Sequence, residues 1–267
     1  MQTQLAPQFA NTPEGIEAAR ILGKCVHCGF CTATCPTYQL LGDELDGPRG
    51  RIYLIKQIAE GQAPTEKTRL HLDRCLTCRN CESTCPSGVQ YGNLVDIGRK
   101  WAEENTPKRP LRERIMRWAL KEGLTKPALF NSAMALGRLV RPLMPSSMQR
   151  KIPVTQNKAL GQSTDPYARP QSKHTRKMLI LEGCVQPGML PNINSATARV
   201  LDALKIQVIS APSATCCGAL RYHLNDQVGG LNNAKQNIDA WWPLVEQGIE
   251  AIVMTASGCG VMVKDYG

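Results

Sequence analysis

The sequence predicts an α+β protein with more than one domain, in which an α-helical, cysteine-rich module precedes an α/β module. A cysteine-rich segment occurs twice in the first 98 residues, and short apolar runs alternate with helix-like segments in the last ninety. The 267 residues, 42% of them hydrophobic, suffice for one large domain or two ordinary ones. We predict domains over residues 1–105 and 177–267, joined by a connector over 106–176.

The first module contains an internal repeat with an offset of 50 residues. The segment from Cys25 to Pro36 reads CVHCGFCTATCP, and it aligns with CLTCRNCESTCP from Cys75 to Pro86. Apolar periodicity predicts three helices around these copies: over Asn11–Leu22, around Ile52, Ile55 and Ala59, and over Thr65–Arg74. The module should therefore be mostly α-helical.

The connector carries the excess positive charge of the chain. The formal net charge is +10, and residues 99–177 alone hold 18 basic and 5 acidic side chains, a net +13, between two nearly neutral modules. Frequent prolines interrupt it. Two short amphipathic helices are predicted around Leu111–Trp118 and Phe130–Gly137, followed by a polar linker over Pro153–Ser172.

The last module alternates strand-like and helix-like segments. Strands are predicted over Met178–Leu181, Ile206–Ile209 and Ala251–Met254, and helices over Asn194–Leu204 and Gln227–Glu246. This order is typical of a βαβαβ parallel sheet. The chain stops where the next crossover helix should be under way, so we expect it to be a C-terminally truncated fragment.

Twelve cysteines are many for a chain of this length, and eight of them lie in the two copies of the repeat. Neither an export signal nor an apolar run of roughly 18 residues is present, which argues against secretion and membrane crossing. We therefore expect a cytoplasmic protein. In a reducing compartment, clustered cysteines favour metal ligation over disulfides.

Each copy has the spacing C-x2-C-x2-C-x3-C-P. This spacing is typical of proteins with two [4Fe-4S] clusters, in which the fourth cysteine of each run ligates the other cluster. We therefore predict one cluster bound by Cys25, Cys28, Cys31 and Cys85, and a second bound by Cys75, Cys78, Cys81 and Cys35. A pair of zinc sites is the alternative, but it would leave the third cysteine of each triplet without a role. His27 is interpreted as a loop residue.

Two arginines near the start of the helix between the copies allow two interpretations. Arg49 and Arg51 either stabilise the negatively charged clusters or pair with nearby carboxylates of Asp43, Glu44 or Asp46. The sequence favours neither.

Four further cysteines follow the C-terminal ends of the three predicted strands: Cys184, Cys216, Cys217 and Cys259. Open α/β sheets place their binding sites at that edge. These residues either form a third metal or redox site or are small buried hydrophobic side chains. His223, nearby, is more typical of a structural histidine.

Common motifs for nucleotides and catalysis are absent. There is no G-x-G-x-x-G, and the segment from Gly61 to Thr68 fails as a P-loop because Glu66 occupies the place of the second glycine. Neither an H-E-x-x-H motif nor a nucleophile elbow occurs. We therefore expect electron transfer without catalytic residues in this chain.

Three stretches give the chain a close resemblance to the iron-sulfur subunits of bacterial glycolate oxidase, a glycolate dehydrogenase: Cys25–Lys56, His71–Pro86 and Asn237–Trp242. The likeness spans nearly the whole chain. The two-cluster motif is shared with subunits of glycerol-3-phosphate dehydrogenase, lactate-utilisation and heterodisulfide-reductase complexes. The substrate assignment therefore rests on the finer match.

The resemblance implies a non-catalytic electron-transfer subunit. Such a subunit joins flavin-binding subunits that oxidise glycolate to glyoxylate, and it relays electrons towards the membrane quinone pool, which implies peripheral contact with the inner face of the membrane. Family members carry two copies of the cysteine-rich, CCG-type C-terminal module. Here the second copy is missing, and Met262 stands where relatives place the second cysteine of a closing C-x2-C. A third cluster is therefore not implied.

The basic connector suggests two other functions. A nucleic-acid-binding protein is one, but the chain has only 5% aromatic residues and its basic residues alternate with apolar helix faces. The other is an amphipathic helix that binds anionic lipid, with four basic residues opposite three apolar ones: Arg112, Arg114, Arg117 and Lys121 against Leu111, Ile115 and Trp118. We favour packing of this helix against the protein's own domains or a flavin subunit.

Overall fold

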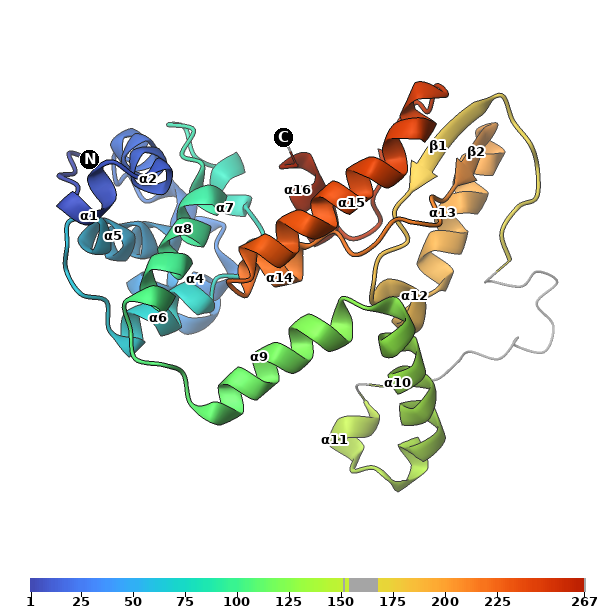
Figure 1. Ribbon diagram of the computed structural model, residues 1–267, viewed down its shortest axis with the longest axis horizontal. Helices are drawn as coiled ribbons and strands as arrows, with labels where there is room; N and C mark the ends of the chain where they lie inside the picture. The colour runs from blue at the N-terminus through green and yellow to red at the C-terminus, as the bar shows by residue number, and fades with distance from the viewer. Residues whose placement is uncertain (151, 154–167, 267) are drawn as a thin grey trace. The chain divides into compact units, whose positions relative to one another are not determined.

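A computed structural model describes residues 1–150, 152–153 and 168–266 (Figure 1). The chain divides into two compact units, Met1–Pro110 and Leu111–Gly267. The first unit is helical and the second contains a small parallel sheet, which confirms the α+β class. None of the helices in the described part of the chain combines the length and apolarity that crossing a bilayer requires.

The first unit is built from eight α-helices and a 3-10 turn: α1 (Pro7–Ala10), α2 (Pro13–Lys24), α3 (Phe30–Ala33), α4 (Pro36–Leu41), η1 (Glu44–Asp46), α5 (Pro48–Ala59), α6 (Glu66–Asp73), α7 (Asn80–Ser83) and α8 (Tyr91–Glu104). Their core contains Ile21, Ile55 and Leu94, all with 0% exposure. Helices α5 and α8 approach closely because Gly98 has no side chain: a Cβ there would lie 2.5 Å from Cγ1 of Ile55. This core supports the cysteine loops on either side of α5.

The starts of the helices that lead into the two copies follow from their side chains. Thr12 caps α2 by accepting a hydrogen bond from the backbone N–H of Gly15, and Thr65 and Thr68 form a capping box at α6. Both predicted helices are confirmed, with ends that differ by one or two residues. Each delivers the chain directly to the first cysteine of its copy.

The repeat extends to the backbone conformation of the cysteine loops. In the first copy His27 and Gly29 have φ of 55° and 86°, and in the second Thr77 and Arg79 have φ of 51° and 58°. These left-handed residues occupy equivalent positions at the offset of 50. Each loop then enters a one-turn helix, α3 or α7. The alternating handedness turns the chain tightly, so that its cysteines face a common space.

The second unit contains three strands and eight α-helices within its described residues: α9 (Leu111–Leu124), α10 (Pro127–Val140), η2 (Arg141–Leu143), α11 (Ser146–Gln149), β1 (Arg176–Ile180), α12 (Gln186–Met189), α13 (Asn192–Ala203), β2 (Ile206–Ile209), α14 (Ala219–His223), α15 (Gln227–Glu246), β3 (Ile252–Val253) and α16 (Ser257–Lys264). Helices α9 and α10 are the two predicted in the connector. Most of the predicted linker Pro153–Ser172 lies outside the described residues.

The sheet has the order β2-β1-β3 with all strands parallel, which confirms the βαβαβ prediction. Leu179 of β1 pairs with Ile209 on one side and with Ile252 on the other. Leu179 and Trp241 of α15 belong to the hydrophobic core of this unit. Because the strands are parallel, the loops that follow them meet at one edge, and these loops carry the four remaining cysteines.

Candidate metal centres

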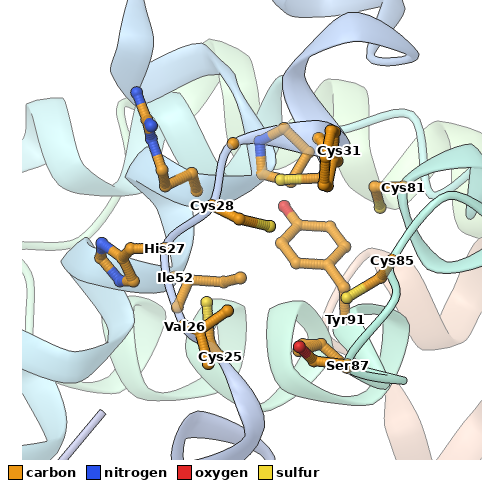
Figure 2. Close-up of a pocket in the computed structure, with 15 residues that line it drawn as sticks. Cys25, Val26, His27, Cys28, Cys31, Ile52, Cys81, Cys85, Ser87 and Tyr91 are labelled. Atoms are coloured by element: carbon orange, nitrogen blue, oxygen red, sulfur yellow. The ribbon is translucent and has the colours of Figure 1, made fainter.

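A first cavity in the helical unit is lined by the four cysteines of the first predicted ligand set (Figure 2). Three come from the first copy and one from the second: Cys25, Cys28, Cys31 and Cys85. Cys81 and Tyr91 also lie in the lining, and Figure 2 shows the Tyr91 ring pointing into the space between the thiols. Cysteines that are far apart in the sequence therefore surround one space.

A second cavity is lined by the other predicted set, which again takes three cysteines from one copy and one from the other: Cys75, Cys78, Cys81 and Cys35. Cys81 and Tyr91 line both cavities, so the two spaces are neighbours. Tyr91 is only 4% exposed. Arg51 and Arg79 complete the polar part of the second lining.

The sulfur atoms around these cavities are widely spaced. Among the described residues, only Asp43, Asp46 and His71 bring three ligand atoms within 4.8 Å of one another, so no three of the sulfur atoms do so. A tetrahedral zinc ion with bonds of about 2.3 Å would hold its sulfur ligands about 3.8 Å apart. The spacing is thus wider than a single tetrahedral zinc ion requires.

Burial keeps several of these thiols protonated while no metal is bound. Loss of solvent raises the pKa of Cys25, raises that of Cys31 to about 11, and raises that of Cys81 further still. A metal must therefore displace these protons when it binds. Burial also lowers the pKa of His27, with a further contribution from Arg49, so the imidazole in the first loop is neutral near pH 7.

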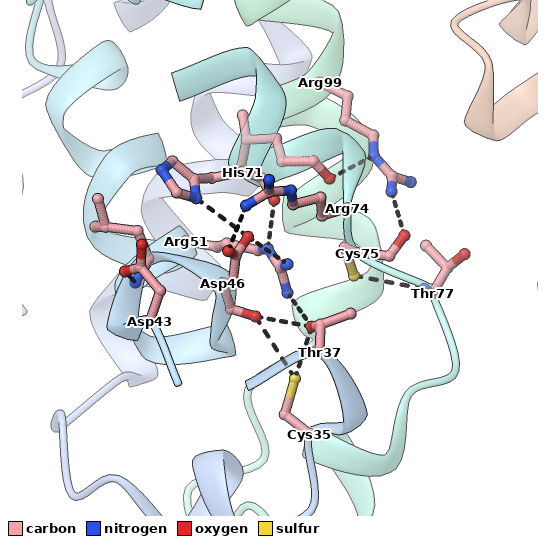
Figure 3. Close-up of polar contacts among 12 residues, drawn as sticks. Cys35, Thr37, Asp43, Asp46, Arg51, His71, Arg74, Cys75, Thr77 and Arg99 are labelled. Carbon is pink, nitrogen blue, oxygen red and sulfur yellow. Dashed lines mark hydrogen bonds and ion pairs between the residues drawn. The ribbon is translucent and has the colours of Figure 1, made fainter. Parts of the chain in front are cut away.

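A hydrogen-bond network surrounds Cys35 (Figure 3). The Cys35 Sγ lies 3.2 Å from Oγ1 of Thr37, which accepts a hydrogen bond from Nη1 of Arg51 at 3.1 Å. The Thr37 hydroxyl also donates to the backbone carbonyl of Asp46 at 2.8 Å. Arg51 and Asp46 are both 0% exposed and form an ion pair at 3.4 Å. Thr37 thus joins a buried ion pair to a thiol.

The structure shows where both arginines at the start of α5 lie. Arg49 lines the first cavity and pairs with Glu44 at 2.6 Å, whereas Arg51 lines the second cavity and pairs with Asp46. Each arginine therefore lines a cavity and also pairs with a carboxylate, so both interpretations that the sequence left open apply.

The close trio of Asp43, Asp46 and His71 is not a metal site. The Asp46 carboxylate already accepts hydrogen bonds from the guanidinium groups of Arg51 and Arg74, at 3.4 and 2.8 Å, and it contacts Nδ1 of His71 at 3.1 Å. Two arginine cations at the carboxylate leave no role for a metal cation. This trio is part of the ion-pair network.

The four cysteines of the second unit lie together at the edge of the sheet. Sγ of Cys216 lies 3.4 Å from Sγ of Cys184, and all four belong to the hydrophobic core that contains Trp241. A hydrogen bond with Cys184 lowers the pKa of Cys216, and one with Cys217 lowers that of Cys259. Met262 is buried in α16.

The turn that carries Cys216 and Cys217 is held by three residues that the sequence did not single out. Gly218 has φ of 84°, and a Cβ there would lie 2.5 Å from the backbone oxygen of Gly230. The fully buried Asn237 donates to the Cys216 carbonyl at 3.1 Å, and the Tyr266 hydroxyl donates to the Cys217 carbonyl at 2.8 Å. Only the glycine has a local sequence signal.

Two family models match the chain where these cysteines lie. Residues 21–89 match the 4Fe-4S dicluster domain, and residues 178–264 match the cysteine-rich domain named CCG. The chain therefore carries a dicluster domain. Two iron-sulfur clusters fit this domain and its two cavities, whose linings together supply eight thiols, with Cys81 present in both.

The chain is similar in sequence to two glycolate oxidase iron-sulfur subunits. It is 57% identical to the glycolate oxidase iron-sulfur subunit of Escherichia coli over all 267 residues, which cover 64% of that protein. It is 34% identical to the probable glycolate oxidase iron-sulfur subunit of Bacillus subtilis over 91% of the chain and 58% of that protein. No solved structure matches. The chain thus spans about three fifths of the length of these relatives.

Proposed function

We propose that this chain is the iron-sulfur, electron-transfer part of a glycolate dehydrogenase. A flavin on a partner subunit would oxidise glycolate to glyoxylate, and this chain would pass the electrons towards a membrane quinone or a similar acceptor. The chain itself contributes no catalytic residue to the oxidation. We also propose that it works in the reducing cytoplasm, which its clustered free thiols support.

One observation carries the proposal: each cavity is lined by the three leading cysteines of one copy of the repeat together with the fourth cysteine of the other copy, and Cys81 lies in both linings. This is the crosswise pattern of two-cluster proteins. We therefore assign the first cluster to Cys25, Cys28, Cys31 and Cys85, and the second to Cys75, Cys78, Cys81 and Cys35. The wide sulfur spacing supports a cluster over a single zinc ion at each site.

The protein contributes position and environment. When bound, the clusters would accept and release electrons one at a time. The shared lining residues Cys81 and Tyr91 keep the two sites adjacent, and the buried core around Leu94 excludes water from their inner sides. Burial in a protein also influences the reduction potential of such clusters.

The substrate and the partner are proposed from the relatives. Both homologues are named as glycolate oxidase iron-sulfur subunits, and 57% identity over the whole chain supports a shared assembly. A related complex for lactate, another 2-hydroxy acid or glycerol 3-phosphate is the alternative, because the two-cluster motif is common to those systems.

Iron analysis tests the ligand sets. The protein, reconstituted without oxygen, should hold about eight iron and eight sulfide ions per chain. The substitution Cys35→Ser should remove the cluster of Cys75, Cys78 and Cys81, and Cys85→Ser the cluster of the first copy. Stoichiometric zinc without sulfide would contradict the proposal.

A pull-down from cells tests the partner. The chain should capture a flavoprotein, and glycolate should then reduce the captured complex, which visible and EPR spectra would record. The matched substrates are lactate and glycerol 3-phosphate. Faster reduction by either of these would assign the chain to that complex instead.

An apolar face on α9 supplies a candidate contact for the flavin subunit. Leu111, Ile115 and Trp118 are 67%, 56% and 63% exposed, and Arg112 and Arg114 flank them. Such a combination suits an acidic, partly apolar protein surface. Co-sedimentation with vesicles tests the competing lipid role: binding to anionic but not neutral vesicles would make this face a membrane contact.

A further inference from the structure

The two cavities of the repeat differ in the burial of their cations. Arg51, which lines the second cavity, is 0% exposed, whereas the Arg49 side chain, which lines the first, is 37% exposed and paired with Glu44. Charges act more strongly inside a protein than at its surface, where water and salt screen them. Arg51 is therefore less screened by solvent than Arg49, although its charge is offset by the buried carboxylate of Asp46.

A second arginine borders the same cavity at an energetic cost. Arg79 aligns with Gly29 at the offset of 50, and both adopt the left-handed conformation, with φ of 58° and 86°. This conformation costs a residue with a side chain about 1–2 kcal/mol, which glycine avoids. At this position of the repeat only the second copy accepts that cost, and Arg79 lines the second cavity.

A third arginine, Arg99, supports the second cavity from α8. It is 4% exposed and donates to the backbone carbonyls of Leu72, at 3.1 Å, and Cys75, at 2.6 Å. It also pairs with Asp96. Arg49, the arginine that lines the first cavity, is only partly buried, with a side chain 37% exposed.

The thiols differ in their hydrogen bonds as well. Thr37 Oγ1 lies 3.2 Å from Cys35 Sγ and accepts a hydrogen bond from Arg51. The Thr37 hydroxyl has a single proton, which it donates to the Asp46 carbonyl at 2.8 Å in this structure. A ligating thiolate can only accept, so a bound cluster requires this proton to turn towards the sulfur atom. The counterpart of Thr37, Ser87, lines the first cavity, but the structure gives it no hydrogen bond with Cys85.

Other charged groups near the cavities reduce the electrostatic difference between them. Asp46 offsets part of the charge of Arg51 and Arg74, and the terminal ammonium group of Met1 adds a cation near the first cavity, 2.9 Å from the Cys25 carbonyl. The formal charges around the two cavities nearly balance. The difference between the cavities therefore rests on the burial of Arg51 and on the contact of Thr37 with the sulfur atom of Cys35.

We infer that Thr37 and Arg51, acting through Cys35, give the cluster of the second cavity the higher reduction potential, so that electrons collect there. Reduction adds negative charge to a cluster, and hydrogen bonds to its sulfur atoms together with buried cations stabilise the reduced form. The inference rests on the ligand sets of the proposed function. Thr37 and Arg51 are positioning residues, because they act through a ligand.

Redox titration of the reconstituted full chain, followed by EPR, tests this order. Thr37→Val removes the hydroxyl and should lower the higher of the two midpoint potentials. A tenfold weaker stabilisation of the reduced form corresponds to about 59 mV for one electron. The matched variant Ser87→Ala should leave both potentials unchanged, and Thr37→Ser, which keeps the hydroxyl, should retain the original value.

The outcomes separate this inference from the proposed function. A wild-type chain that binds no iron and sulfide defeats the proposed function itself. With two clusters present, the potential order is overturned if Thr37→Val changes neither potential or lowers the lower one, or if Ser87→Ala has an equal effect. Should Thr37→Val fail to load, Arg51→Lys decides by the same readout, since it keeps the charge but loses the guanidinium contact.

Discussion

The cysteines of the two units differ in the spaces that they line. In the helical unit eight cysteines line two neighbouring cavities, although five of them also lie in or against the hydrophobic core. In the α/β unit the sulfur atoms of Cys184 and Cys216 are 3.4 Å apart, and the four cysteines lie in or against the hydrophobic core. Cysteine density alone therefore does not define a cluster site: the space that the backbone leaves between the thiols does.

Removal of iron should give the largest difference between the two units. Chelation of the reconstituted chain should remove the hydrogen-exchange protection of the backbone amides in the cysteine loops of Met1–Pro110. Without iron, the free energy of local opening of these loops should be about 0 kcal/mol. The backbone amides of the α/β unit should keep their hydrogen-exchange protection, because the thiols of this unit already pack against one another. Hydrogen exchange of peptides from α3 and α7, compared with β1 and α15, measures both responses.

The opposite result would be equally informative. If chelation exposed β1 and α15 as much as the cysteine loops, the four thiols of the α/β unit would also hold a metal. The comparison between the units would then fail. Apo protein prepared without prior reconstitution serves as the control for damage caused by the chelator.

A substitution in the α/β unit should have the next largest effect. Gly218→Ala places a Cβ 2.5 Å from the backbone oxygen of Gly230 at a φ of 84°. Left-handed strain and overpacking together should lower the free energy of unfolding by about 2–4 kcal/mol. Urea unfolding, monitored by hydrogen exchange in α15, measures the loss of unfolding free energy. The iron content of the protein should not change.

Gly248 offers a matched control for that substitution. Its φ is 89°, but no atom lies within 4 Å of the position that a Cβ would take. Gly248→Ala should therefore cost only the left-handed strain, about 1–2 kcal/mol. Equal losses in the two variants would show that the contact with Gly230 does not constrain the turn at Cys216 and Cys217.

Local patterns predicted much of this architecture. The Ile206–Ile209 strand and the Gln227–Glu246 helix have the predicted bounds, because apolar periodicity and flanking breakers mark them clearly. The spacing of the cysteines predicted two ligand sets, and seven of those eight cysteines line only the cavity of their own set, while Cys81 lines both. Helix α8 was not predicted, since Gly92 and Gly98 weaken its helical pattern. Both glycines serve close packing, which only the three-dimensional structure reveals.

The surroundings of the thiols could not be predicted in the same way. The contact of Thr37 with Arg51 joins residues 14 positions apart, and Asn237 reaches the Cys216 carbonyl over 21 positions. Such contacts depend on how helices pack, and no local spacing encodes them. Arg79 is an intermediate case, because its alignment with Gly29 signals an unusual backbone but not which cavity it lines.

The smallest effect should come from the contact that joins the two copies to each other. Thr84 and Thr34 occupy equivalent positions of the repeat, and their hydroxyl groups lie 3.3 Å apart. Thr84→Val removes this contact together with the hydrogen bond from the same hydroxyl to the Asn80 carbonyl at 3.0 Å, and it should lower the free energy of unfolding by about 0.5–1.5 kcal/mol. Iron content and both midpoint potentials should stay unchanged, because the hydroxyl contacts no sulfur atom. Urea unfolding measures the loss, and Ser83→Ala, which removes only a local, exposed hydrogen bond to Asn80, is the control. Loss of iron in Thr84→Val would instead mean that the junction between the copies holds the cavities open, and the contrast with the closely packed thiols of the α/β unit would then depend on this one contact.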